Sequence, residues 1–299
     1  MRGLRRPSSH VDHLQHVPIG WVIGDVSDPA SLEAAFSDCE VVFHCAALVS
    51  VRKQASPALR STNVEGTRNV VAAAKRAGVR RLVHCSSMAA IGIGSAAAPA
   101  TEQTAWNFAE YGLADGYAVT KREAEAMVLG DPTLDVVIAN PTLLMGPYDA
   151  KVSSGKLIIE TVQGHVPGYT LGSNNFADVR DVARGLVQLW QKGRRGERYI
   201  LGGENLSYRD VMARIARLAG VPPLRFALPR TVARIMGAAG DLIERFGREP
   251  LLNSMTMRYV YTDIHFSSDK ARREVGYVTS PIDQAIQSAI DWFRSHQMV

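Results

Sequence analysis

The sequence predicts an α/β fold, in which a doubly wound parallel sheet carries a smaller C-terminal α/β lobe. Three short apolar runs, 40–47, 80–87 and 134–139, have the length and the β-branched content of buried parallel strands. Stretches with helical signals separate these runs, and strand–helix–strand units of this kind place their strands side by side. The 299 residues, 46% of them hydrophobic, suffice for one large domain with a lobe built on it.

Turn and capping residues mark the remaining elements of the core. Residues 21–25 continue the strand pattern, and Asp28 then begins a helix as its N-cap, with a proline in the first turn. Ser56 begins a longer helix, which ends at Gly78 because glycine suits the position just after a helix. A third helix is expected within 115–130, where the sequence again ends in glycine.

The lobe follows a Gly-Pro pair at 146–147, which turns the chain away from the sheet. We therefore expect a core domain over 1–145 and a lobe over 146–299, with 176–202 returning to the core sheet. Residues 231–246 form an amphipathic helix, for which packing on its own domain is favoured over contact with a membrane surface.

Composition excludes several classes of partner. The net charge of +5 is scattered, without a Lys/Arg run that would indicate a nucleic-acid partner. No apolar run reaches membrane-spanning length, and no signal peptide is recognised, so a cytoplasmic location is expected. Cys39, Cys45 and Cys85 lack metal-ligand spacing, which favours buried free thiols in a reducing compartment and no metal site.

Tyr117 and Lys121 are the first candidates for chemistry. They are four residues apart, so a helix would place them on one face. A positive charge beside a phenol lowers its pKa, and such a phenol exchanges a proton with a carbonyl or an alcohol. The pair is short enough to occur by chance, and a solvated helix face is the alternative interpretation.

A hydroxyl at the end of a strand gives this pair a context. Ser86 and Ser87 end the run 80–87, and the carboxyl ends of parallel strands border the crevice in which α/β folds bind ligands. Ser87 is therefore placed to bond the oxygen that Tyr117 protonates, whereas a loop cap is the simpler alternative. His44 lies within a strand and is interpreted as a core histidine.

These segments together resemble the extended short-chain dehydrogenases/reductases, which contain a Rossmann-like doubly wound sheet. The tail, through 198–203 and 269–277, is similar to bacterial members related to dihydroflavonol reductases, 3β-hydroxysteroid dehydrogenases and hopanoid-associated sugar epimerases. The matching segments span residues 1 to about 185: Gly24-Asp-Val26, His44-Cys-Ala-Ala47, Asn63-Val-Glu-Gly-Thr67, Ser86-Ser87, Tyr117-x-x-x-Lys121, Asn140-Pro-x-x-x-x-Gly-Pro147 and Asp178-Val-Arg-Asp-Val-Ala183.

The resemblance implies roles for individual residues. Tyr117 would be the acid/base, Lys121 would lower its pKa and hold the nicotinamide ribose, and Ser87 would polarise the substrate oxygen. Asn63 would support a proton relay, and Arg180 with Asp181 would lock the lobe to the core. Residues 1–145 would bind a dinucleotide through Asp25, Val26, Cys45, Ala46, Ala47, Tyr117, Lys121, Asn140 and Pro141. Substrate would contact Met88, Trp106, Tyr111 and Asn175.

The beginning of the sequence departs from the family pattern. Residues 1–9 resemble the end of the second strand, and no glycine-rich strand–turn–helix unit precedes them to hold a diphosphate. The sheet would therefore lack its first strand and helix. A start codon assigned too late, an inactive truncated relative, and another chain or segment that fills the gap are the three explanations. Arg5 and Arg6 stand where NAD-binding members have an acid, which favours NADP over NAD, unless both are merely solvated.

We therefore expect an NAD(P)-dependent oxidoreductase of the dihydroflavonol-reductase-like type, acting on a carbonyl or alcohol of a small molecule. One alternative is a nucleotide-sugar epimerase/dehydratase that retains its NAD. Another is a truncated relative that no longer binds a cofactor, and a partner-binding fragment is the least favoured. A homodimer through the helices bearing Asn63 and Tyr117 is expected from the resemblance.

Overall fold

The computed structural model describes residues 1–9, 11–246 and 252–299. Its central sheet has four parallel strands with the spatial order β3-β4-β5-β8. Each strand is short, and β5 is buried along its whole length, as expected for a parallel sheet covered on both faces. The strands are β3 (Val41–His44), β4 (Arg81–Cys85), β5 (Val136–Pro141) and β8 (Arg198–Leu201).

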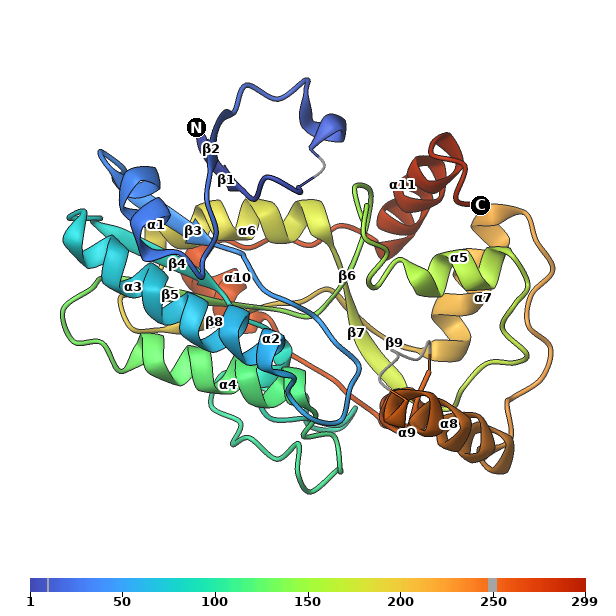
Figure 1. The fold of residues 1–299 in the computed structure, drawn as a ribbon. Helices are drawn as coiled ribbons and strands as arrows, with labels where there is room; N and C mark the ends of the chain where they lie inside the picture. Colours follow the sequence, from blue (N-terminus) through green and yellow to red (C-terminus); the bar gives the residue numbers. More distant parts are fainter. Residues whose placement is uncertain (10, 247–251) are drawn as a thin grey trace.

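Helices cover both faces of this sheet (Figure 1). On one face Leu82, Val136 and Ile138 pack against α1 (Pro29–Phe36), α3 (Gly66–Arg76) and the end of α4 (Gly116–Leu129). On the other face Val83, Val137 and Ala139 pack against α6 (Val179–Lys192) and α10 (Asp269–Val275). Alternate residues of one strand thus serve opposite cores, because side chains alternate across a strand. The predicted doubly wound α/β fold is confirmed.

Strands β1 (Arg2–Arg5) and β2 (Gly20–Ile23) pair with each other in parallel and form a separate sheet. Among the described residues, no ladder joins this pair to the four-stranded sheet. The pair is held instead by Leu4 and Val22, which pack on the core beside α1, and by Arg2, which bonds the Ala35 carbonyl at 2.9 Å. A sheet that lacks its first strand would be divided at this place.

The expected helix from Ser56 to Gly78 is interrupted. It consists of α2 (Pro57–Arg60), a π-helical turn (Ser61–Glu65) and α3. The Ser56 side chain caps its beginning by accepting from the Leu59 amide, as the sequence predicts. The π turn carries Asn63, and such turns occur often at functional positions.

The lobe has its own three-stranded sheet, in which β7 (Ser173–Asp178) pairs with β6 (Leu143–Met145) and with β9 (Glu204–Ser207). Three helices surround a core with buried Phe176 and Phe293: α5 (Lys156–Val162), α7 (Tyr208–Ala219) and α11 (Ile282–Ser295). Of the segment 176–202, α6 and β8 return to the core sheet, whereas the residues of β7 stay in the lobe sheet. Two further helices, α8 (Arg230–Arg245) and α9 (Ser254–Tyr259), pack together beside the lobe. Among the described residues, no helix is long and apolar enough to span a membrane.

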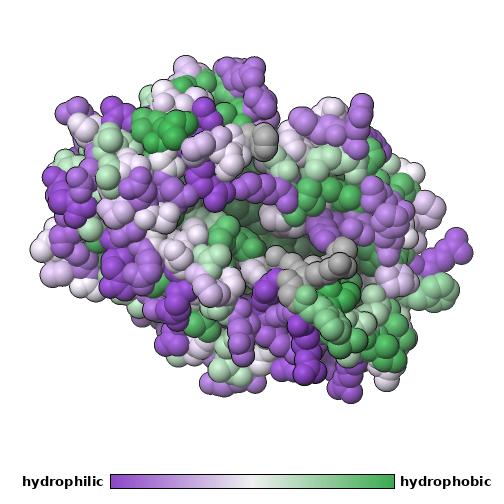
Figure 2. All heavy atoms as spheres, viewed as in Figure 1, coloured by the Kyte–Doolittle hydropathy of each residue, from purple (hydrophilic) through white to green (hydrophobic). Residues whose placement is uncertain are grey.

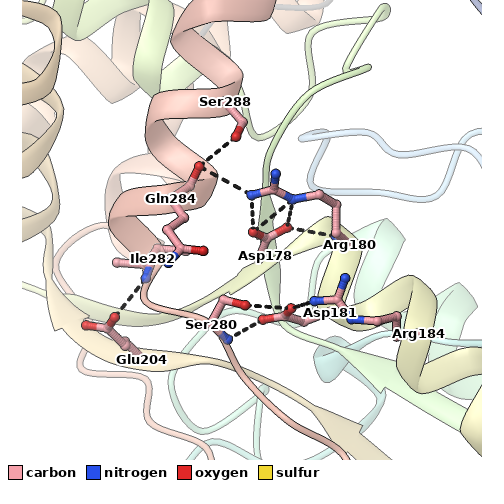
Figure 3. Close-up of polar contacts among 9 residues, drawn as sticks. All are labelled: Asp178, Arg180, Asp181, Arg184, Glu204, Ser280, Ile282, Gln284 and Ser288. Atoms are coloured by element: carbon pink, nitrogen blue, oxygen red, sulfur yellow. Dashed lines mark hydrogen bonds and ion pairs between the residues drawn. The ribbon is translucent and has the colours of Figure 1, made fainter.

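A polar network joins the start of α6 to the segment before α11 (Figure 3). Asp178 caps α6 and bonds the Arg180 guanidinium, whose Nη2 also donates to the Gln284 carbonyl at 3.3 Å. Asp181 accepts from the Ser280 amide at 2.5 Å and from its hydroxyl at 3.0 Å. Arg180 and Asp181 therefore have the locking role that the sequence suggested.

Candidate active site

The first turn of α4 places Tyr117 at the carboxyl ends of the core strands. Asp115 caps this helix by accepting from the Ala118 amide at 2.7 Å. Gly116 lies so close to the backbone of 54–55 that a Cβ would approach the Ala55 nitrogen to 2.3 Å. Only glycine fits this contact, and it fixes the position from which the next residue, Tyr117, extends.

The Ser87 hydroxyl lies near enough to the Tyr117 phenol to lower the pKa of that phenol. Ser87 also caps the 3₁₀ turn Met88–Ala90, accepting from the Ala89 amide at 3.2 Å. The capping interpretation of Ser87 is confirmed, and its contact with a substrate oxygen stays a prediction. The strand end and the helix start converge as the sequence indicated.

The expectation that Lys121 lowers the pKa of Tyr117 is wrong for this structure. Burial raises the pKa of Tyr117 to about 12, and the hydrogen bond with Ser87 offsets only part of that effect. Desolvation disfavours the charged phenolate, and the Lys121 ammonium is directed elsewhere. The phenol is consequently protonated at neutral pH and is suited to give a proton.

Lys121 is buried, with 3% of its surface exposed, and its Nζ donates to the Cys85 carbonyl at 2.9 Å. Burial lowers the pKa of this ammonium. The Cys45 thiol donates a hydrogen bond to the Cys85 sulfur and so lowers the pKa of Cys85, and the Lys121 charge has a smaller effect in the same direction. Cys45 is exposed and Cys85 partly so, which corrects the expectation of buried thiols.

Asn63 acts on the site through its neighbours. Its side chain is 2% exposed, accepts from the Leu48 amide at 2.8 Å and donates to the Leu48 carbonyl at 3.0 Å. It also donates to the Thr120 hydroxyl at 3.2 Å, one residue before Lys121. Asn63 thus ties the segment after β3 to α4, which is a positioning role; its part in a proton relay stays a prediction.

Residues suited to the adenosine end of a dinucleotide lie at the ends of β1 and β2. Arg5 Nε is buried and has no hydrogen-bond partner among the described residues. Arg6 and Asp25 are both half-exposed, with 3.9 Å between Nε and a carboxylate oxygen. Asp25 accepts from the Ser27 amide, which lowers its pKa, while Val26 is buried. Arg5 and Arg6 thus lie near each other at this end of the sheet, with the Arg5 Nε buried and unpaired among the described residues.

The opposite end of such a cofactor would meet the carboxyl ends of β3 and β5. Cys45 and Ala46 are exposed and Ala47 is half-buried, so this backbone is accessible to a ligand. Asn140 donates to the Ser87 carbonyl at 3.0 Å, its Oδ1 has no partner among the described residues, and Pro141 beside it is buried. Their part in binding a dinucleotide stays a prediction. Within the described residues before β3, no glycine-rich turn is available for the diphosphate.

The four predicted substrate contacts differ in their placement. Trp106 donates to the Ala89 carbonyl at 2.9 Å. Trp106, Met88 and Tyr117 all pack on one buried hydrophobic cluster. Tyr111 is 42% exposed on the surface. Asn175 is 1% exposed, and its amide bonds Thr142, Asn205 and the Gly203 backbone within the lobe. Contact of Met88 and Trp106 with a substrate stays a prediction.

Sequence reasoning missed a buried carboxylate that supports the site. Glu125 is 2% exposed and accepts from Asn140 at 2.6 Å and from Arg198 at 3.1 Å. It lies four residues after Lys121 on the same helix face, so the 3.6-residue period would have indicated it.

A separate cavity of about 390 Å³ borders Asp149 and Arg180 but none of Ser87, Tyr117 or Lys121.

His44 and His84 form a buried pair beneath the site, with ring centroids 5.2 Å apart. His44 bonds Thr67 at 2.9 Å, which confirms its interpretation as a core histidine. Burial lowers the pKa of His44 to about 3 and holds the pKa of His84 well below its usual range, and Lys121 adds to both effects. Both rings are therefore neutral in the folded protein at neutral pH.

This pair predicts acid destabilisation. Below pH ~6.5 the unfolded histidines bind protons that the folded ones do not, so the free energy of unfolding falls as pH drops. Burial raises the pKa of Asp115 to about 6. Between pH ~4 and ~6 the folded state therefore binds a proton on Asp115 that the unfolded state does not, and this opposes the acid destabilisation by the histidines. We expect His84→Leu to reduce the acid loss by about 1.4 kcal/mol per pH unit.

Urea denaturation at pH 7, 6 and 5 measures this slope. His84 has no hydrogen-bond partner among the described residues, so leucine breaks no bond there. His165→Asn is the matched control, because its ring is 62% exposed. An unchanged slope in His84→Leu would show that His84 is protonated in the folded protein.

Comparison with known proteins gives a consistent result. The model of the NAD dependent epimerase/dehydratase family matches residues 1–202. A Synechocystis sp. protein provisionally named dihydroflavonol 4-reductase is 34% identical over 307 residues, covering 100% of this chain and 89% of that protein. Sterol demethylase protein B of Methylococcus capsulatus is 32% identical over 305 residues, with coverage of 100% and 92%. The structure of a nucleoside-diphosphate-sugar epimerase from Pseudomonas aeruginosa matches with a TM-score of 0.81 at 26% identity, covering 99% of this chain and 90% of that one.

Proposed function

Because this chain belongs to the NAD-dependent epimerase/dehydratase family, we propose that it is an NAD(P)-dependent oxidoreductase for a carbonyl/alcohol pair of a small molecule. The observation that carries the proposal is the contact between the Ser87 hydroxyl and the Tyr117 phenol, with Lys121 buried one turn further along α4. A relative of similar length named for dihydroflavonol reduction supports the same class of reaction.

The chain's own residues supply proton transfer and positioning. A bound nicotinamide would supply the hydride, which is chemistry that the protein itself lacks. Ser87 donates to the substrate oxygen and Tyr117 gives it a proton, and we propose Met88 and Trp106 as apolar contacts for the substrate. Lys121 donates to the Cys85 carbonyl at 2.9 Å, and we propose that it also contacts a ribose hydroxyl of the bound cofactor.

We propose that the same groups serve reduction and oxidation. The pKa of Tyr117, raised to about 12 by burial, keeps the proton on the phenol at neutral pH. The phenol can therefore give this proton to a carbonyl oxygen as that oxygen gains negative charge, and the phenolate that forms can take a proton from an alcohol in the reverse reaction. The ratio of reduced to oxidised cofactor, rather than the pKa of Tyr117, decides the net direction.

NADP is the proposed cofactor because Arg5 and Arg6 stand at the end of β1, with the Arg5 Nε buried and unpaired among the described residues. Thermal shift with NADPH and with NADH tests this. We expect a larger shift with NADPH than with NADH. The double variant Arg5→Ala, Arg6→Ala should lower the apparent affinity for NADPH at least tenfold and leave the response to NADH unchanged. Arg68→Ala is the control, because that side chain is 60% exposed and pairs only locally with Glu65.

A flat response to both nucleotides would contradict cofactor binding and favour a relative that no longer binds dinucleotide. A nucleotide-sugar epimerase remains the second candidate, favoured by the similarity to the Pseudomonas aeruginosa structure. Purified protein that carries NAD and consumes no net NADPH would support this candidate.

We also propose a homodimer through α3 and α4 and a cytoplasmic location. Size-exclusion chromatography with light scattering tests the dimer.

A further inference from the structure

Helix α8 exposes an apolar stripe. Ile235 is 70% exposed, Leu242 54% and Phe246, just after the helix, 78%. With Val232 and Ala239 they recur at spacings of three and four residues, so they lie along one side of the helix. In Figure 2 hydrophobic residues gather at the lower right, over the position of α8 in Figure 1. Large exposed apolar patches indicate an interaction surface.

The helix packs on the protein through its other side. A Cβ on Gly237 would lie 2.8 Å from the Ser254 Cα, and one on Gly240 would lie 1.7 Å from the Leu252 carbonyl oxygen. These glycines and the buried Ala233 bring α8 against α9 at close range. The expected packing of this helix on its own domain therefore uses its small residues and leaves the large apolar ones outside.

Its charges are segregated in the same way. Asp241 bonds Lys53 at 2.7 Å and the Ser254 amide at 3.0 Å, and Glu244 accepts from Asn253 at 3.1 Å. Both acids thus face the protein. The arginines of the helix, Arg230, Arg234 and Arg245, are exposed. Helical spacing places Arg234 and Arg245 next to the apolar stripe, whereas Arg230 lies nearer the packed side. Arg230 also lies over the Tyr261 ring, 5.6 Å from its centroid.

We propose that α8 docks on an anionic membrane surface, with the apolar stripe inserted at the acyl boundary and the arginines at the lipid phosphates. A helix with apolar side chains on one side and arginines along their border has the composition of an interfacial helix. A second copy is a poorer occupant. Stable protein interfaces use about 20 residues per partner, and antiparallel pairing of two such helices would bring the arginine edges together.

Vesicle co-sedimentation tests the proposal with the whole chain. We expect binding to vesicles of phosphatidylglycerol and phosphatidylcholine, and at least fivefold weaker binding to phosphatidylcholine alone. Ile235→Glu combined with Leu242→Glu should lower binding to anionic vesicles at least tenfold. Both side chains are more than half exposed, so this variant should fold with an unchanged Tm and an unchanged response to NADPH.

Val278→Glu is the matched control, because Val278 is 72% exposed and lies outside α8; it should sediment like the natural sequence. Ile235→Trp gives a second measurement, a blue shift of its fluorescence with anionic vesicles. Equal sedimentation of the double variant and the natural sequence, or none by either, would overturn the proposal. The proposal would also be overturned if light scattering shows a dimer of the natural sequence, the double variant is a monomer, and neither protein binds vesicles.

Discussion

Tyr117→Phe is expected to lower kcat by about 10²–10⁴, the range attributed to a positioned proton donor, while the Kd of NADPH stays within about twofold. The substitution removes one hydroxyl and keeps the ring, which packs on the same buried cluster as Trp106. Because the phenol gives its proton only as the substrate oxygen gains charge, its loss affects the transition state more than binding. Steady-state NADPH oxidation with a carbonyl substrate and a separate nucleotide titration measure the two quantities.

Tyr148→Phe is the matched control, since Tyr148 is 50% exposed and lies apart from Ser87 and Lys121. It should keep the kcat of the natural sequence. Activity of Tyr117→Phe within threefold of that value would refute the role of this phenol. Equal losses of kcat and of nucleotide affinity would instead assign Tyr117 to cofactor binding.

Asp181→Ala is expected to destabilise the fold by about 3 kcal/mol, because removing one partner of a buried, hydrogen-bonded charge leaves the others unsatisfied. The carboxylate is 1% exposed, accepts from the Ser280 amide and hydroxyl, and contacts Arg184. The Arg184 side chain is 62% exposed, so its guanidinium is solvated by water when Asp181 is removed. Most of the lost free energy of unfolding therefore comes from the two donors of Ser280 that lose their acceptor. At about 2–4 °C per kcal/mol, Tm should fall by roughly 6–12 °C.

The control for this substitution is Asp269→Ala. Asp269 pairs with Arg272 three residues on, and both are largely exposed, so its loss should change the free energy of unfolding by less than about 0.5 kcal/mol. Urea denaturation of both variants gives the comparison. If Asp181→Ala unfolds within 1 kcal/mol of the natural sequence, the joint between α6 and α11 in Figure 3 does not stabilise the fold.

The convergence of Ser87 and Tyr117 was predictable because parallel strands end at one edge of a sheet, and a capped helix begins beside that edge. The raised pKa of Tyr117 was not, since it depends on how completely other segments bury the ring. The orientation of Lys121 toward the Cys85 carbonyl is likewise tertiary. Local pattern predicts which element bears a residue, whereas desolvation depends on the whole packing.

Three further features that the sequence did not predict also depend on tertiary packing. The π turn at 61–65 follows from packing against α4 and leaves no mark in a helical pattern. Asn175 looked like a polar residue at the substrate mouth, yet its amide is satisfied by Thr142 and Asn205 from neighbouring segments. The amphipathic pattern of α8 was visible in the sequence, but its orientation was set by two glycines that approach residues 252–254.

The division between the β1–β2 pair and the four-stranded sheet has a consequence for cooperativity. Neighbouring strands that share a ladder tend to open together as one unit, and the described residues show no ladder between β1 and β3. The pair can therefore detach by losing the packing of Leu4 and Val22 and the bond of Arg2, while the Ser87–Tyr117 contact persists. The structure around Tyr117 would then stay folded after the β1–β2 pair, which carries Arg5, has detached.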